Sequence, residues 1–150
     1  MKPWYGLLVA LLLWPLTVWS QETPALAGTI KTTSGTAHVE RQGQRLAAAV
    51  GMVVLRNDRL VTGNPGSVGL TLVDDTLLTL DAETQLELSE VRFDSTTNEG
   101  RLWLRLVKGA VHVVTGLIAK ESPKNIRIET PTAVMGVRGT AFIVESGSRP

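Results

Sequence analysis

The residues of this chain that could do chemistry are few and scattered. The histidines His38 and His112 are each flanked by strand-like apolar residues, and neither belongs to a spacing such as HExxH that brings two ligands to one metal ion. The carboxylates of Asp74 and Asp75 are adjacent, but neighbouring residues in a turn normally point to solvent rather than working as an acid and base pair. We therefore expect no metal, no cofactor and no catalytic residue.

The remaining candidates for covalent chemistry are equally weak. Ser67 lies in the segment GNPGSVG, which lacks the GxSxG pattern of a nucleophile elbow. The same segment lacks the lysine and the following helix of a phosphate-binding loop. The chain contains no cysteine, which excludes disulfides, thiol catalysis and the acylated cysteine of a bacterial lipoprotein. The sequence therefore predicts a protein that is not an enzyme.

The most unusual stretch is IETPTAVMGVRGTAFIV near the C-terminus, where Arg138, Gly139 and Thr140 interrupt an apolar run. We expect residues 133–137 and 141–144, which are apolar on both faces, to be strands enclosed by the fold. Gly139 would allow a bend, and the Arg138 guanidinium, with five donors, would bind the carbonyl groups that the bend exposes. We predict that VRGT is a structural latch. The alternative is a ligand-binding arginine.

The elements that must position these residues are strands, because apolar and polar residues alternate with a period of two. No stretch has a sustained helical period, and glycine, proline, asparagine and aspartate supply frequent turns, so the sequence predicts an all-β fold. The alternating apolar residues are Leu70, Leu72, Leu78, Leu80, Leu86, Leu88, Leu102, Leu104, Leu106, Val111, Val113, Ile126 and Ile128. The opposite face would carry Thr71, Thr79, Glu87, Arg105, His112 and Arg127. Turns are expected at Gly43, Gly51, Asn64–Gly66, Asp74–Asp75, Asp81, Asn98–Gly100, Lys108–Gly109 and Ser122–Pro123.

Length and composition indicate one domain. The chain has 150 residues, of which 43% are hydrophobic and 19% charged, an ordinary composition for a single core. Fifteen basic residues stand against 14 acidic ones with no basic block, so we expect no binding of nucleic acid. The paired leucines between Leu70 and Leu88 recur about every eight residues, which permits a rolled β-solenoid or a sandwich-like meander.

The first residues, MKPWYGLLVALLLWPLTVWSQETPALAG, follow the order of a secretory signal peptide: a lysine, a short apolar run and a polar stretch. We expect cleavage after Ser20, with cleavage after Ala27 as the alternative. The apolar run is shorter than the roughly 20 residues that span a bilayer, so retention as an anchor is the less favoured outcome. The predicted location is the periplasm or another extracytoplasmic space, with membrane contact only through an uncleaved signal segment.

The C-terminal motif and the segments before it resemble the FecR domain family. The segment GMVVLRNDRLVTGNPGSVGLTLVDDTLLTLDAETQLEL, then LWLRLVKGAVHV, then IRIETPTAVMGVRGTAFIV follow the family pattern in order, from about Gly35 to Val144. The main motif consists of Thr130, Pro131, Val137, Arg138, Gly139 and Thr140. A secondary motif consists of Asp58, Thr62, Gly63 and Gly109.

This resemblance implies an extracytoplasmic all-β module like that of the iron-responsive FecR sensors. Those sensors carry a cytoplasmic segment and a membrane helix before the domain, whereas a signal-like segment stands here, so we expect no direct contact with a sigma factor. The expected organisation is a signal peptide (1–20), an N-terminal segment (21–34), a FecR-like β domain (35–146) and a tail (147–150). The expected partner is an envelope protein or glycan. The alternative is a signalling component that acts with a TonB-dependent receptor or an anti-sigma partner.

Overall fold

A computed structural model describes residues 18–20 and 25–147, which contain ten strands and two short helical turns. The predicted all-β fold is therefore confirmed. The helical turns, α1 (Leu117–Glu121) and η1 (Pro123–Asn125), connect β7 to β8. The strands are β1 (Leu26–Arg41), β2 (Gln44–Ala47), β3 (Val53–Leu55), β4 (Arg59–Leu72), β5 (Leu77–Leu80), β6 (Gln85–Asp94), β7 (Glu99–Val114), β8 (Ile126–Glu129), β9 (Val134–Gly136) and β10 (Ala141–Ser146).

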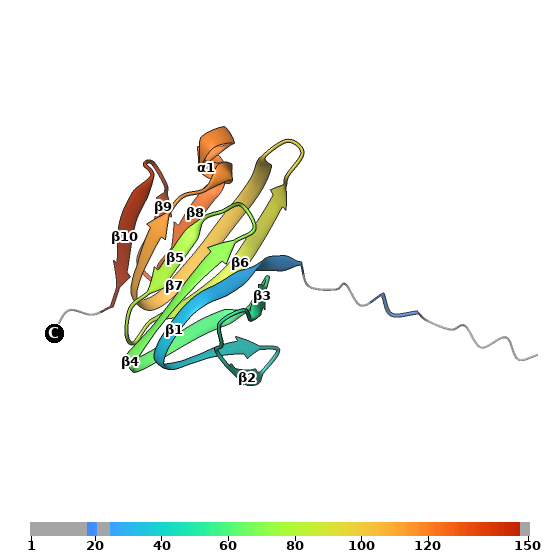
Figure 1. The fold of residues 1–150 in the computed structure, drawn as a ribbon. Helices are drawn as coiled ribbons and strands as arrows, with labels where there is room; N and C mark the ends of the chain where they lie inside the picture. Colours follow the sequence, from blue (N-terminus) through green and yellow to red (C-terminus); the bar gives the residue numbers. More distant parts are fainter. Residues whose placement is uncertain (1–17, 21–24, 148–150) are drawn as a thin grey trace, which may run out of the picture.

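Three long strands, β1, β4 and β7, build both halves of the sheet because each changes partners along its length (Figure 1). In one half, β6 pairs with the beginnings of β4 and β7, and β8 and β9 continue the sheet beyond β7. In the other half, β5 pairs with the ends of β4 and β7, and β10 pairs with β7. We call these the β6 half and the β5 half, after the strand that each contains whole.

One apolar core lies between the two halves, since buried residues from both belong to a single cluster. The sheet is therefore rolled so that its halves face each other, as in a sandwich. The predicted polar faces are confirmed as well, because every residue assigned to them is half-buried or exposed. All the alternating apolar residues are at most 2% exposed: Leu70, Leu72, Leu78, Leu80, Leu86, Leu88, Leu102, Leu104, Leu106, Val111, Val113, Ile126 and Ile128.

Two of the predicted turns are wrong, because the chain bends at them without leaving its strand. Residues 64–66 lie inside β4, and Lys108 and Gly109 lie inside β7. The bend in β4 faces Gly35 of β1, whose φ of +63° and close approach to the Pro65 carbonyl exclude a side chain. Glycine and proline mark the places where the long strands change partner, which sequence patterns do not distinguish from strand ends.

The arrangement of the strands decides between the two folds that the sequence permitted. Successive rungs of a solenoid pair in parallel, whereas β4 and β5 pair antiparallel. Among the described strands, parallel pairing occurs between β7 and β8. The solenoid is therefore excluded, and the described strands form one continuous sheet rolled around a single core.

The domain also begins earlier than predicted. Residues 26–34, assigned to an N-terminal segment, form the first part of β1, and Ala27 and Ile30 there are fully buried. The pattern was missed because threonine, lysine and serine occupy most of this stretch, so few apolar residues reveal the alternation.

The predicted signal peptide lies mainly outside the described residues, which exclude 1–17 and 21–24. Both cleavage after Ser20 and retention as an anchor therefore stay predictions. In the described part of the chain, no helix is long and apolar enough to cross a membrane.

Because the chain has no cysteine, no disulfide contributes to its stability. The melting temperature should be the same with and without reducing agent, and the far-ultraviolet circular dichroism should show β structure with little helix. Thermal melts of the purified protein in both buffers check this. A helix-dominated spectrum would contradict the fold.

Candidate functional site

The main motif lies on two exposed connections at the end of the chain. Thr130 and Pro131 form the turn between β8 and β9, where the Thr130 backbone N–H donates to the Ala133 carbonyl (2.8 Å) and the Ala133 N–H donates to the Thr130 hydroxyl (3.1 Å). Proline with its fixed φ and threonine with a hydroxyl that binds the local backbone are residues that favour such a turn. Val137 to Thr140 form the next connection, from β9 to β10.

The predicted arginine latch is wrong. Arg138 is exposed, and its side chain makes no hydrogen bond or ion pair to any residue that the structure describes. The carbonyl groups at this corner are bound by Thr115 instead: its N–H donates to Thr140 O (2.8 Å), and its hydroxyl donates to Gly139 O (3.1 Å). The corner turns its carbonyls toward the end of β7, which leaves the guanidinium in solvent.

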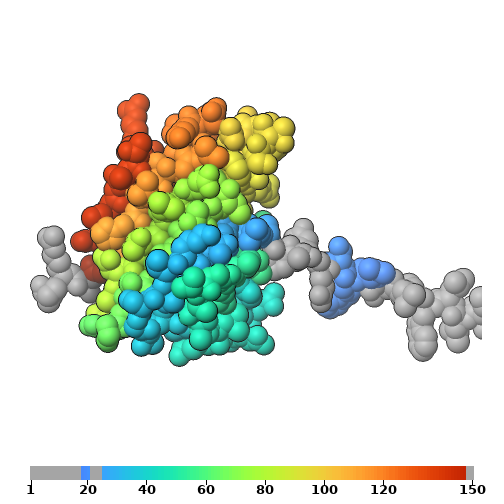
Figure 2. Space-filling model, in the orientation of Figure 1, coloured from blue at the N-terminus to red at the C-terminus, as the bar shows by residue number. Residues whose placement is uncertain are grey.

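The expected enclosure of the flanking strands is also wrong. Val134 in β9 is 59% exposed and Ile143 in β10 is 56% exposed. Both strands lie at the border of the sheet, and each pairs with one described neighbour, β9 with β8 and β10 with β7. Figure 2 shows the C-terminal strand at the margin of the molecule. The strands β9 and β10, which are apolar on both faces, are therefore border strands of the sheet and not central ones.

The register of β10 shows which of its backbone groups turn away from β7. The Thr115 N–H donates to the Thr140 carbonyl, so these residues form a hydrogen-bonded pair at the start of the ladder. Bonded and non-bonded pairs alternate along an antiparallel ladder, so Phe142 and Val144 turn their backbone groups toward β7. Ile143 therefore directs its N–H and C=O away from β7, toward the open edge.

An apolar surface adjoins this edge. Leu77 on β5 and Val114 on β7 are 46% and 44% exposed and are register partners. Val114 also pairs with Ala141, and the next row contains Thr79, His112 and Ile143. The open edge of β10 thus borders a mainly apolar face.

The residues of the secondary motif stabilise two places in the fold: the turn between β3 and β4, and the surroundings of Thr84. Asp58, 1% exposed, accepts hydrogen bonds from the Arg41 guanidinium (2.6 and 2.9 Å) and from the Leu55 N–H (2.8 Å). The hydrogen bonds to Asp58 raise the pKa of Arg41 above its ordinary value, against the opposing effect of burial.

Thr62, Gly63 and Gly109 come together around buried Thr84, where β7 changes partner from β6 to β5. The Thr62 hydroxyl accepts from the Thr84 N–H (2.9 Å), and the Thr84 hydroxyl accepts from the Ala110 N–H (3.1 Å). The Gly63 carbonyl accepts from the Glu83 backbone N–H (3.1 Å), next to Thr84 in the chain. These motif residues join β4 and β7 to the turn between β5 and β6, at the point where the sheet rolls over.

Each of the two histidines lies beside one carboxylate. His112 Nε2 lies 2.9 Å from a carboxylate oxygen of Asp81, and His38 Nε2 lies 3.4 Å from Glu40. No group of three or more metal-ligating side chains is found among residues 18–20 and 25–147. Contrary to expectation, Asp74 is fully buried in its turn.

A family model described as FecR protein matches residues 58–150, which is more than half of the chain and includes every residue of both motifs. The chain belongs to the FecR family. The resemblance is therefore confirmed, although the matched region of this FecR chain begins at Asp58 rather than near Gly35. No curated protein and no solved structure matches it.

Sequence reasoning missed two features of this FecR chain. One is the open edge of β10, which the apolar run Ala141–Val144 could have revealed if it had been interpreted as a border strand. The other is a hollow beside Trp103 on the β6 half. Trp103 is the one tryptophan outside the signal-like segment, and that isolation was the available signal.

Proposed function

We propose that this FecR-family chain is a non-enzymatic binding module that works outside the cytoplasm and binds an extended segment of an envelope protein along β10. The observation that carries the proposal is the open backbone edge of β10, next to an arginine without a partner among the described residues. In strand addition, hydrogen bonds along an open edge supply affinity and the flanking side chains supply specificity.

The composition of β10 favours this use. Soluble proteins usually protect an edge strand with lysine, proline, a bulge or a covering segment. The strand AFIVES contains neither lysine nor proline, and its register with β7 is regular over all six pairs. The outward side chains of Ala141 and Ile143 would pack against alternate residues of an incoming strand.

Arg138 favours an acidic partner. It lies just before β10, it is exposed, and the described residues supply it with no carboxylate. A guanidinium binds a carboxylate through two parallel hydrogen bonds, so an aspartate or glutamate at one end of the bound segment would fix its register. Membership of the FecR family favours a signalling role for the complex, with a TonB-dependent receptor or an anti-sigma protein as the partner.

The decisive experiment is quantitative capture from the envelope with four baits: the wild type, Ile143→Pro, Ile143→Val and Arg138→Ala. Proline removes an N–H that points to the open edge and leaves the β7 ladder complete, whereas valine keeps that N–H. We expect the wild type and Ile143→Val to retain the same protein and Ile143→Pro to lose it at least about tenfold, which corresponds to about 1.4 kcal/mol.

Two outcomes would contradict the proposal. Retention of the same partner by Ile143→Pro would exclude strand addition at this edge. The other is a wild-type bait that forms dimers, which Ile143→Pro abolishes. The occupant of the edge would then be a second copy of the chain instead of an envelope partner, and size-exclusion chromatography with light scattering would detect the dimer.

Arg138→Ala should leave the free energy of unfolding within about 0.5 kcal/mol of the wild type, because the side chain is exposed and makes no bond to the described residues. The same substitution should weaken the captured complex by about tenfold through loss of a charge-assisted hydrogen bond, since such bonds contribute about 1.5–3 kcal/mol. Urea unfolding and titration of the purified partner measure the two effects. A large loss of stability with unchanged binding would restore the latch.

A further inference from the structure

The outer face of the β6 half carries a row of alternating charges across six strands. Neighbours in this row are register partners, and ion pairs join several of them, including Arg59 to Glu87 at 3.2 Å and Arg105 to Glu129 at 3.3 Å. Positive and negative charges balance along the row, so it has no net charge. Its members are Arg45, Glu40, Arg59, Glu87, Arg105 and Glu129, on β2, β1, β4, β6, β7 and β8.

The next row of the same face contains an aromatic side chain. Trp103 on β7 lies between its register partners Glu90 on β6 and Arg127 on β8. The Arg127 guanidinium lies 5.0 Å from the centre of the indole ring, a distance at which a cation–π contact stabilises both side chains. Ser89 is the additional residue of a bulge in β6, between the pairs made by Leu88 and Glu90.

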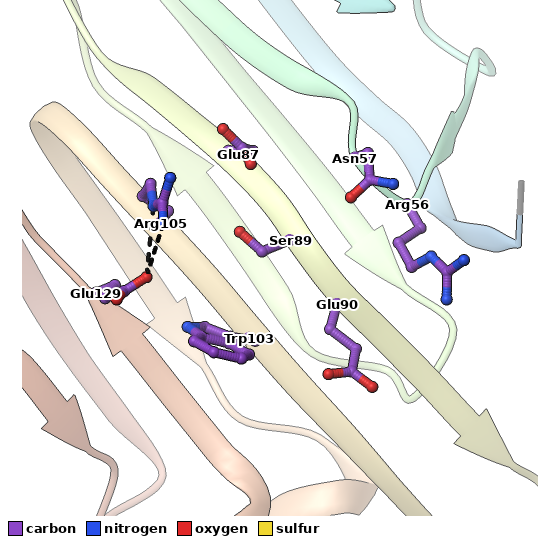
Figure 3. A pocket seen from close by; sticks show the side chains of 8 residues that line it. All are labelled: Arg56, Asn57, Glu87, Ser89, Glu90, Trp103, Arg105 and Glu129. Atoms are coloured by element: carbon purple, nitrogen blue, oxygen red, sulfur yellow. Dashed lines mark hydrogen bonds and ion pairs between the residues drawn. The ribbon is translucent and has the colours of Figure 1, made fainter.

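A hollow of about 390 Å³ lies between these two rows (Figure 3). Its volume is within the range of about 300–1,000 Å³ that is typical of small-molecule sites. It is lined by Arg56, Asn57, Glu87, Ser89, Glu90, Trp103, Arg105 and Glu129.

Two buried polar atoms in this lining have no hydrogen-bond partner among the described residues: the Ser89 hydroxyl oxygen and the Trp103 indole nitrogen. A buried polar group without a partner costs about 1–3 kcal/mol, and native proteins retain few of them. Figure 3 shows the nitrogen end of the indole directed toward Arg105 and Glu129. That ion pair is half exposed at the arginine, and surface pairs of this kind contribute little, so a ligand could displace it at small cost.

From this geometry we infer that the hollow is a binding site for a neutral saccharide chain. Three carboxylates and two guanidinium groups line it, so a phosphate gains no net electrostatic attraction. Each of the three carboxylates is already ion-paired with an arginine, which leaves little for a cation to gain. A sugar hydroxyl both donates and accepts hydrogen bonds, so it suits carboxylates, guanidinium groups, the Asn57 amide, the Ser89 hydroxyl and the indole N–H at once.

The adjoining surface favours a chain over a single sugar. A second hollow shares Trp103 and is lined also by Arg101, Lys124 and Arg127, and a third shares Arg105 and Glu129 and reaches Pro131. The three follow β7 from residue 101 to residue 107, which is about 20 Å of extended strand.

A peptide strand fits this face poorly. The hollow lies over the middle of the sheet, where β7 pairs with β6 on one side and with β8 on the other. The backbone groups there are already paired, so an incoming peptide would find no ladder to extend. The site is therefore distinct from the open edge of β10 in both position and chemistry.

The test uses the full chain labelled with ¹⁵N, and the indole N–H resonance of Trp103 is assigned as the one missing from Trp103→Phe. The probes are the tetrasaccharides of β-1,4-linked N-acetylglucosamine and of β-1,4-linked glucose, which distinguish a cell-wall type of glycan from a plain hexose chain. We expect one of them to shift the Trp103 resonance. Ser89→Ala, followed at the same resonance, and Trp103→Phe, followed at the backbone amide resonances, should each weaken binding at least fivefold, with melting temperatures within a few degrees of the wild type.

Ser67→Ala, which changes a serine of β4 that lines none of these three hollows, is the matched control and should bind as the wild type does. Three outcomes would overturn the inference. One is no shift with either tetrasaccharide at millimolar concentration. Another is that the Trp103 indole resonance shifts in the Glu129→Gln variant but does not shift when either sugar is added to the wild type. That result would mean that the indole N–H is bonded to Glu129. The third is a larger shift with tetra-alanine than with the sugars, which would assign the hollow to peptides.

Discussion

Gly109→Val should lower the free energy of unfolding by about 4 kcal/mol or more, a large part of the 5–15 kcal/mol that is usual for a folded domain. Gly109 has a φ of +91°, in the region that β-branched residues avoid. A Cβ atom there would lie 2.5 Å from Thr84 Cα and 2.7 Å from Thr84 Cβ. Backbone strain and a clash with a buried residue would therefore act together.

The neighbourhood of Gly109 cannot relax cheaply. Thr84 is fully buried, and its hydroxyl accepts from the Ala110 N–H while its backbone N–H donates to the Thr62 hydroxyl. Moving Thr84 away from a new side chain would break these bonds where β7 changes from β6 to β5.

Gly43→Val is the control for backbone strain. Gly43 also has a positive φ, +76°, but a Cβ atom there would meet nothing within 4 Å. Urea unfolding of both variants isolates the clash: Gly43→Val should cost about 1–3 kcal/mol, as strained backbone does. If both variants lose the same free energy of unfolding, the clash with Thr84 contributes nothing to the cost of a side chain at position 109.

The core of this fold was predictable because its strands are half-buried. Leu104 and Leu106 alternate with Arg105, so the period of two reveals both the strand and the face that it buries. The roll of the sheet was not predictable from the same pattern. Alternation indicates that β7 is extended, but the change from β6 to β5 near Gly109 depends on pairing between residues distant in sequence.

The candidate sites were predicted less well, and for a physical reason. The apolar run at Ile143 predicts a strand, but the same run suits an enclosed strand and an open edge, and only the neighbours decide. Arg138 was therefore assigned carbonyl partners that Thr115 binds instead. The Trp103 hollow combines side chains from β6, β7 and β8 and the turn before β4, an arrangement that arises only when the sheet is assembled.

Asp74 is the clearest case of a residue whose role depends on the assembled fold. A sequence of two adjacent aspartates predicts a solvated turn, and Asp75 is indeed exposed, with a φ of +66°. Asp74 is fully buried because the segment after β7 packs over the turn. Its carboxylate accepts from the Thr76 hydroxyl (2.8 Å) and N–H (3.2 Å) and from the Ile118 N–H (3.4 Å), which connects the β4–β5 turn to α1.

Asp74→Ala should therefore cost about 3–5 kcal/mol, because it leaves several buried donors unsatisfied, each at about 1–3 kcal/mol. The loss should extend to α1, since the Thr76 hydroxyl that binds Asp74 also accepts from the Gly116 N–H (3.1 Å). Asp75→Asn is the matched control, since asparagine tolerates a positive φ, and it should change stability by less than about 0.5 kcal/mol. Urea unfolding gives both values, and hydrogen exchange should show faster exchange at Ile118 in Asp74→Ala alone. If Asp74→Ala costs no more than Asp75→Asn, the carboxylate is solvated in the folded protein and does not join the turn to α1.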